Sequence, residues 1–93
     1  MESFDGKIAV VTGGGTGMGR ELVCQLIAAG AHVATCDVIE ENLLETKALA
    51  EKKGTGQVTT HICDVSDEEQ QLRFREEVAV QHGSEHIDLL FNN

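Results

Sequence analysis

Hydrophobic residues along the chain switch repeatedly between two periodicities, one typical of buried strands and the other of amphipathic helices. Short β-branched or apolar runs predict strands at residues 7–12, 31–37, 57–64 and 87–92. The segments between them predict helices at residues 17–29 and 40–53, and a third that ends before Gly83. Strands that alternate with such helices indicate right-handed βαβ units. The chain is therefore predicted to be an α/β protein with a parallel sheet and helices on both faces.

The ends and buried sides of the helices can also be predicted. Gly30 is placed to end the first helix, and Ser66 and Glu69 form the S-x-x-E pattern of a capping box for the third. In the first helix, four apolar residues recur at helical spacing: Leu22, Val23, Leu26 and Ile27. In the second helix, the apolar residues expected on one side are Leu43, Leu44, Ala48 and Leu49.

Composition narrows the range of functions. With 93 residues the chain can form one core but not two. Its net charge of −9 argues against nucleic-acid grooves and anionic membranes, because both need basic surfaces. Three widely spaced cysteines, Cys24, Cys36 and Cys63, fit neither a disulfide framework nor a zinc site, so we expect buried thiols in the cytoplasm. The chain has no tyrosine, which excludes catalysis by a phenol within it.

Glycines cluster where the first strand ends, in the segment T-G-G-G-T-G-M-G-R at residues 12–20. Glycines before a helix let backbone N–H groups approach an anion at the positive end of that helix. The ATPase phosphate loop does not fit, because Arg20 and Glu21 replace its lysine and hydroxyl. The common G-x-G-x-x-G fingerprint fails as well, since Met18 stands where the third glycine is required. The pattern T-G-x-x-x-G-x-G does fit, with Gly13, Gly17 and Gly19 in register.

This motif resembles the glycine motif of the short-chain dehydrogenases/reductases. Further matches in that family's order are Asp37 after the second strand, Asp64-Val65 after the third, and Asn92-Asn93, which resemble the start of its N-N-A-G motif. Met18 stands where the family more often has Ile or Leu. The resemblance implies a Rossmann-like doubly wound parallel sheet of four strands in the order 3-2-1-4 with three helices. It also implies that this sheet is incomplete, with residues 1–93 as the amino-terminal part of one NAD(P)-binding domain.

The resemblance also assigns roles to the matched positions. Gly13 would make the turn, while Gly17 and Gly19 would allow close approach of the pyrophosphate and of helix to sheet. Asp64 and Val65 would meet the adenine, and Asn92 would lie beside the ribose of the cofactor. The candidate cofactor-binding residues are Gly13, Gly15, Thr16, Gly17, Met18, Gly19, Asp37, Val38, Asp64, Val65 and Asn92.

Asp37 also predicts which dinucleotide binds. A carboxylate about 20 residues past the glycines can accept hydrogen bonds from the adenosine ribose hydroxyls. It would repel a 2′-phosphate, and no Lys or Arg stands at residues 14–16, 38 or 39 to receive one. NAD is therefore the expected cofactor. A second role remains open, because Asp37 and Glu40 form a D-x-x-E pattern that could cap the second helix.

The residues that perform chemistry are expected outside this chain. In the resembling family, hydride transfer uses a serine with the tyrosine and lysine of Y-x-x-x-K, all of which follow N-N-A-G. No catalytic residue and no metal ligand is assigned here. We expect the NAD-binding part of a homodimeric or homotetrameric oxidoreductase that acts on an alcohol or ketone, inactive by itself. The alternative is a catalytically silent nucleotide-binding or interaction module.

Overall fold

The computed structural model describes residues 3–83 and 86–93. Strands and helices alternate along the chain as predicted, and most ends differ from the predicted ones by one or two residues. The elements are β1 (Ile8–Thr12), α1 (Gly17–Ala28), β2 (His32–Asp37), α2 (Glu40–Glu51), β3 (Val58–Ile62), α3 (Glu68–Gln81) and β4 (Leu89–Asn92).

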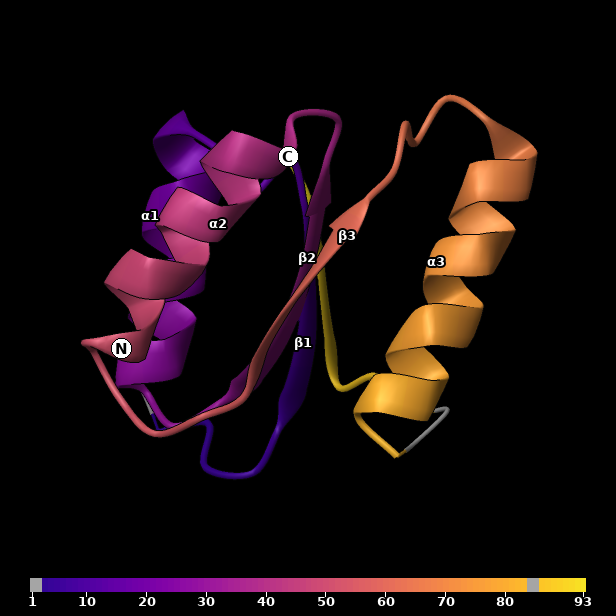
Figure 1. Cartoon of the computed structure of the whole chain (residues 1–93). Helices are drawn as coiled ribbons and strands as arrows, with labels where there is room; N and C mark the ends of the chain where they lie inside the picture. Colours follow the sequence, from indigo (N-terminus) through magenta and orange to yellow (C-terminus); the bar gives the residue numbers. More distant parts are fainter. Residues whose placement is uncertain (1–2, 84–85) are drawn as a thin grey trace.

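The four strands form one parallel sheet in the order β3-β2-β1-β4. Residues Ile8 to Thr12 of β1 pair with His32 to Cys36 of β2 on one side, and β4 pairs with β1 on the other. Helices α1 and α2 cover one face of the sheet and α3 covers the other (Figure 1). The prediction of a doubly wound Rossmann-like sheet is confirmed.

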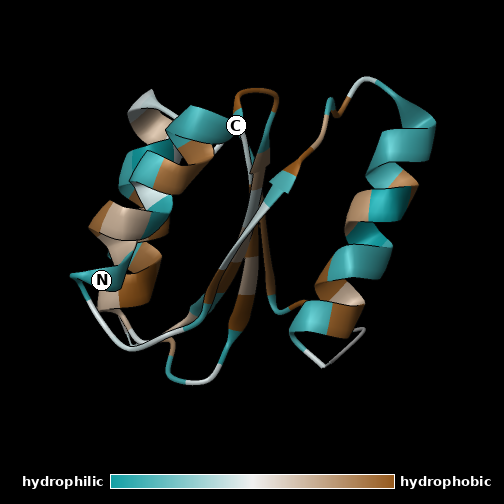
Figure 2. Cartoon of the chain, in the orientation of Figure 1, coloured by the Kyte–Doolittle hydropathy of each residue, from teal (hydrophilic) through white to brown (hydrophobic). Residues whose placement is uncertain are grey.

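Successive residues of the strands point to opposite faces, so the sheet separates two clusters of buried side chains. In β1, Ala9 and Val11 pack on the side of α1, whereas Val10 packs on the side of α3. The α1 cluster also contains Val23, Cys24, Leu26, Ile27, Ala31, Val33, Ala50 and Val58. The α3 cluster contains Ala34, Cys36, Cys63, Phe74 and Val78. Most of the α3 ribbon is teal, the colour of hydrophilic residues (Figure 2).

The buried side of α2 differs from the predicted one. Leu44 and Leu49 are 52% and 37% exposed, while the buried residues of this helix are Leu43, Thr46 and Ala50. The cause is a long-range contact, since the Thr46 hydroxyl donates a hydrogen bond to the carbonyl of Gly14 at 2.7 Å. This contact turns a polar residue inward.

The start of α3 was also predicted wrongly. Asp67, not Ser66, is the N-cap, and its carboxylate accepts hydrogen bonds from the backbone N–H groups of Glu69 and Gln70. The hydroxyl of Ser66 instead donates to Asp64 at 2.7 Å. The Asp67 carboxylate also places a negative charge at the positive end of the helix, which stabilises it.

Other predictions of local structure are confirmed. Gly30 adopts φ +97° just after α1, as a helix-ending glycine does. Cys24, Cys36 and Cys63 are buried free thiols, and burial raises the pKa of Cys36 to about 12.

Among the described residues, no helix is both long and apolar enough to cross a membrane.

Candidate functional site

The glycine loop between β1 and α1 has a backbone that other residues adopt only with strain. Gly13 has φ +72° and Gly17 has φ +57°, both in the left-handed region. The N–H groups of Gly13 and Gly14 donate to the carbonyl of Cys36 at 2.8 and 3.1 Å, which ties the start of the loop to β2. The fixed spacing of Gly13 and Gly17 thus has a conformational reason.

Two further glycines are required because the backbone approaches its neighbours closely. A Cβ atom on Gly19 would lie 2.0 Å from the carbonyl oxygen of Gly13, so the first turn of α1 packs directly on the end of β1. A Cβ atom on Gly14 would lie 1.8 Å from Oγ1 of Thr35. The loop has no room for side chains at these positions.

The start of α1 can receive a negative charge. Thr16 is its N-cap, with extended backbone and no side-chain hydrogen bond to the helix, and the first turn contains no acidic residue. The positive end of the helix is therefore not neutralised by the helix itself. Met18 beside it is 82% exposed.

Asp37 lies where β2 ends, against the glycine loop. One carboxylate oxygen, Oδ2, accepts from the N–H of Gly15 at 2.9 Å, and the other, Oδ1, accepts from the N–H of Val38 at 2.8 Å. The N-cap of α2 is Ile39, which has no side-chain cap, so the alternative that Asp37 caps this helix is wrong. Val38 is 58% exposed next to the carboxylate.

Asp64 follows β3 at the same edge of the sheet. Its Oδ1 accepts from the side chain and the backbone N–H of Ser66 at 2.7 and 2.9 Å, and these bonds lower the pKa of the Asp64 carboxyl. The neighbouring Val65 is 43% exposed. An ionised acid and an exposed apolar side chain thus lie together after β3.

The end of β4 contacts the loop directly. Asn92 pairs in register with Thr12, and its side chain is exposed. The next residue, Asn93, donates from its backbone N–H to Oγ1 of Thr12 at 3.1 Å and from Nδ2 to the carbonyl of Gly13 at 3.2 Å. Asn93 therefore stabilises the turn, while Asn92 stays open to solvent.

The predicted site residues lie at one edge of the sheet, because the carboxyl ends of parallel strands meet there. The strand order reverses between β1 and β4, and ligands of such sheets bind in the crevice at that point. A hollow of about 160 Å³ lies beside it under α3, with Thr12, Val65 and Asn92 in its lining. Within residues 3–83 and 86–93, the edge offers backbone N–H groups, carboxylates and an amide, which suit binding of a polar ligand.

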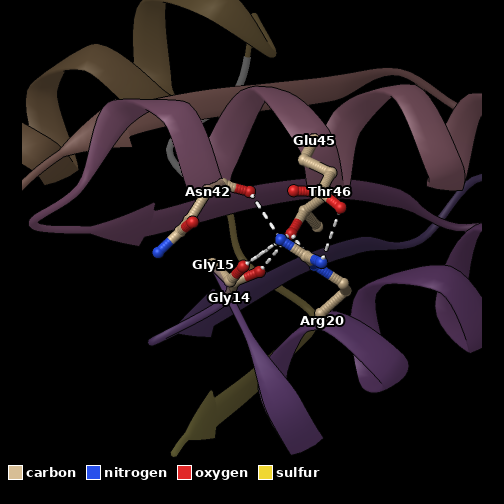
Figure 3. Close-up of polar contacts among 6 residues, drawn as sticks. All are labelled: Gly14, Gly15, Arg20, Asn42, Glu45 and Thr46. Atoms are coloured by element: carbon tan, nitrogen blue, oxygen red, sulfur yellow. Dashed lines mark hydrogen bonds and ion pairs between the residues drawn. The ribbon is translucent and has the colours of Figure 1, made fainter.

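Sequence reasoning missed a group of residues behind the loop, which we call the loop clamp: Arg20, Thr46 and the carbonyls of Gly14 and Gly15 (Figure 3). Arg20 Nη2 donates to the carbonyl of Gly15 at 2.5 Å, and its Nε donates to Oγ1 of Thr46 at 2.9 Å. Glu45 forms an ion pair with Arg20 at 3.3 Å. The signal in the sequence that could have indicated this group is Arg20 itself, because the helix dipole disfavours a basic residue in the first turn of a helix.

A parallel sheet with the strand order β3-β2-β1-β4 and a glycine loop after β1 defines a Rossmann-type fold. The family model described as short chain dehydrogenase matches residues 7–93. The chain belongs to the short-chain dehydrogenase/reductase family of oxidoreductases.

Known proteins support this placement. A tropinone reductase homolog of Arabidopsis thaliana is 40% identical over 92 residues, which cover 98% of this chain and 33% of the relative. The NAD+-bound xylitol dehydrogenase superimposes with a TM-score of 0.91 at 32% identity, over 99% of this chain and 34% of that one. The NADP complex of RhlG from Pseudomonas aeruginosa gives 0.82 at 32% identity, over 98% and 35%. The chain spans about a third of the length of these relatives.

Proposed function

We propose that this chain is the NAD-binding part of a short-chain oxidoreductase that transfers a hydride between NAD(H) and an alcohol or ketone. The observation that carries the proposal is the position of Asp37, whose carboxylate lies 2.9 Å from the N–H of Gly15 at the mouth of the glycine loop. A carboxylate at the end of the second strand is the group that accepts hydrogen bonds from an adenosine ribose.

The roles of the other residues follow from their positions at the edge. The N–H groups at the start of α1, from Thr16 onward, would face the pyrophosphate, and the exposed Met18 would flank it. Asp64 and Val65 would contact the adenine from the end of β3. Asn92, open to solvent at the end of β4, would lie beside the ribose next to the nicotinamide.

Charge supports NAD over NADP, a choice that the family leaves open because structures of both kinds match this chain. A 2′-phosphate about 4 Å from Asp37 would be repelled by about 4 kcal/mol at an effective dielectric of about 20. Arg20 lies near the loop but does not offset this charge. Its Nε and Nη2 groups are bonded to Thr46, Gly15 and Asn42, and its Nη1 is paired with Glu45.

The bound nicotinamide would supply or accept the hydride, while this chain binds and orients the dinucleotide. The chain contains no tyrosine to protonate or deprotonate the substrate oxygen. The proposal therefore assigns the reacting groups to the two thirds of the relatives' length that this chain does not span.

The test is a comparison of NADH and NADPH binding by fluorescence titration. We expect NADH to bind at least tenfold more tightly, equivalent to about 1.4 kcal/mol. Asp37→Asn, which removes the charge, should shrink that ratio, whereas the control Glu69→Gln on the exposed start of α3 should leave it unchanged. Equal affinity of the unmodified chain for both dinucleotides would refute the NAD assignment, and no binding of either would refute the proposed function.

A further inference from the structure

We propose that Arg20 and Thr46 are positioning residues, which fix the orientation of the peptide groups of the glycine loop and thereby its affinity for the dinucleotide. This inference rests on the proposed function for its ligand. Neither residue lies on the ligand side of the loop, since both contact its carbonyl oxygens from the side of α2 (Figure 3).

The clamp acts on two successive peptide groups. Oγ1 of Thr46 donates to the carbonyl of Gly14 at 2.7 Å and lies 3.3 Å from that of Gly15, which Arg20 also contacts. In a trans peptide the C=O and the following N–H point in opposite directions. Holding the Gly14 carbonyl toward α2 therefore aims the N–H of Gly15 at Asp37, and the 2.9 Å bond between them is observed. By the same geometry, holding the Gly15 carbonyl aims the N–H of Thr16 away from α2.

Glycine makes such an external restraint necessary. A loop with three consecutive glycines at residues 13–15 has many accessible backbone conformations, and ordering it costs conformational entropy. A restraint that already orders the free protein spares a ligand that cost on binding. The clamp supplies it with groups from two different helices, α1 and α2.

The surroundings of Arg20 agree with a dedicated role. It is the fourth residue of α1, where a cation is disfavoured by the helix dipole. Thr46 is fully buried and the Arg20 side chain is only 22% exposed, so these polar groups depend on the hydrogen bonds that they form with each other and with the loop. The carbonyl of Asn42 accepts a further bond from Nη2 at 3.1 Å.

The test compares Thr46→Val, which removes the hydroxyl at nearly constant volume, with Thr46→Ser, which keeps it. Thr46→Val should weaken NADH binding about tenfold, the equivalent of one or two hydrogen bonds, and Thr46→Ser should stay within about twofold of the unmodified chain. Hydrogen exchange of the amides of residues 14–17, measured without dinucleotide, should become faster in Thr46→Val but not in Thr46→Ser. Arg20→Lys, which keeps the charge but not the forked geometry, should show the same change as Thr46→Val.

A control separates positioning from general stability. Val58→Ala opens a cavity beside β3, away from the loop. Its binding of NADH is measured at a temperature at which its free energy of unfolding equals that of Thr46→Val. It should bind NADH as the unmodified chain does. The proposal is overturned if Val58→Ala weakens binding equally, or if Thr46→Val changes neither binding nor loop exchange. If the unmodified chain binds no dinucleotide, the proposed function fails, and the exchange comparison still decides whether the clamp orders the loop.

Discussion

Replacing Gly19 by alanine tests the close packing of α1 on the end of β1. The new Cβ atom would lie 2.0 Å from the carbonyl oxygen of Gly13, where an ordinary contact needs 3.4 Å or more. Helix and strand must therefore separate by about 1.4 Å, and overpacking of this kind costs about 1–3 kcal/mol. Alanine gains about 1 kcal/mol of helix propensity over glycine. Because the atom met is rigid backbone, we expect the upper part of the range and a net loss of about 1–2 kcal/mol.

The assay is thermal and urea unfolding of the Gly19→Ala chain beside the unmodified one. For a domain of this size the midpoint should fall by about 4–8 °C for each kcal/mol lost. NADH affinity should fall as well, because the displaced carbonyl belongs to the turn at Gly13. Met18→Ala, one residue away and 82% exposed, serves as the control for stability and should leave the unfolding midpoint unchanged. A Gly19→Ala chain as stable as the unmodified one would mean that helix propensity outweighs the contact, and would refute this reasoning.

Substitutions at three other residues test separate features of the structure. Gly17→Ala should lower the free energy of unfolding in urea by about 1–2 kcal/mol, because Gly17 has a φ of +57°. Gly17→Asn should lower it less, because asparagine adopts this conformation more readily and no atom lies within 4 Å of the new Cβ position. Equal losses in the two variants would contradict this. Thr35→Val should destabilise the chain by about 1–3 kcal/mol, since the Thr35 hydroxyl donates to the buried carbonyl of Val11 at 2.8 Å, and Thr35→Ser should restore most of the loss. The bond from the Ile8 N–H lowers the pKa of Asp88, so its contribution is present above the unfolded pKa of about 3.8 and is lost as pH falls through the lower folded value. Unfolding from pH 6 to 2 should therefore show a shallower loss of stability in Asp88→Asn, and parallel curves would contradict the assignment.

The order and type of the elements could be predicted because periodicity is a local property of the sequence. The buried side of α2 could not be predicted, because the buried Thr46 forms a hydrogen bond with the carbonyl of Gly14, 32 positions earlier in the chain. The cap of α3 was predicted at Ser66, whereas Asp67 is the N-cap. Their roles depend on Asp64, which takes the Ser66 hydroxyl.

The candidate site could be predicted as far as it follows from glycine spacing and strand ends. Asp37 and Asp64 lie at the edge where the parallel strands end, as the motif predicts. Arg20 was read only as a mismatch to another phosphate loop, because its partners Glu45 and Thr46 belong to a helix that packs beside it only after folding.

The contacts around the glycine loop fall into two groups by separation along the chain, and this has a kinetic consequence. The bonds to Asp37 and Thr46 span 22 to 32 positions, whereas those of Asn93 to Thr12 and Gly13 span 80 or 81. Closing a longer loop costs more entropy, and distant contacts slow folding. We therefore expect β1, α1, β2 and α2 to form the adenosine side of the edge as an early unit, with β4 docking afterwards. Pulse-labelling of amides during refolding would then protect Gly15 before Asn93.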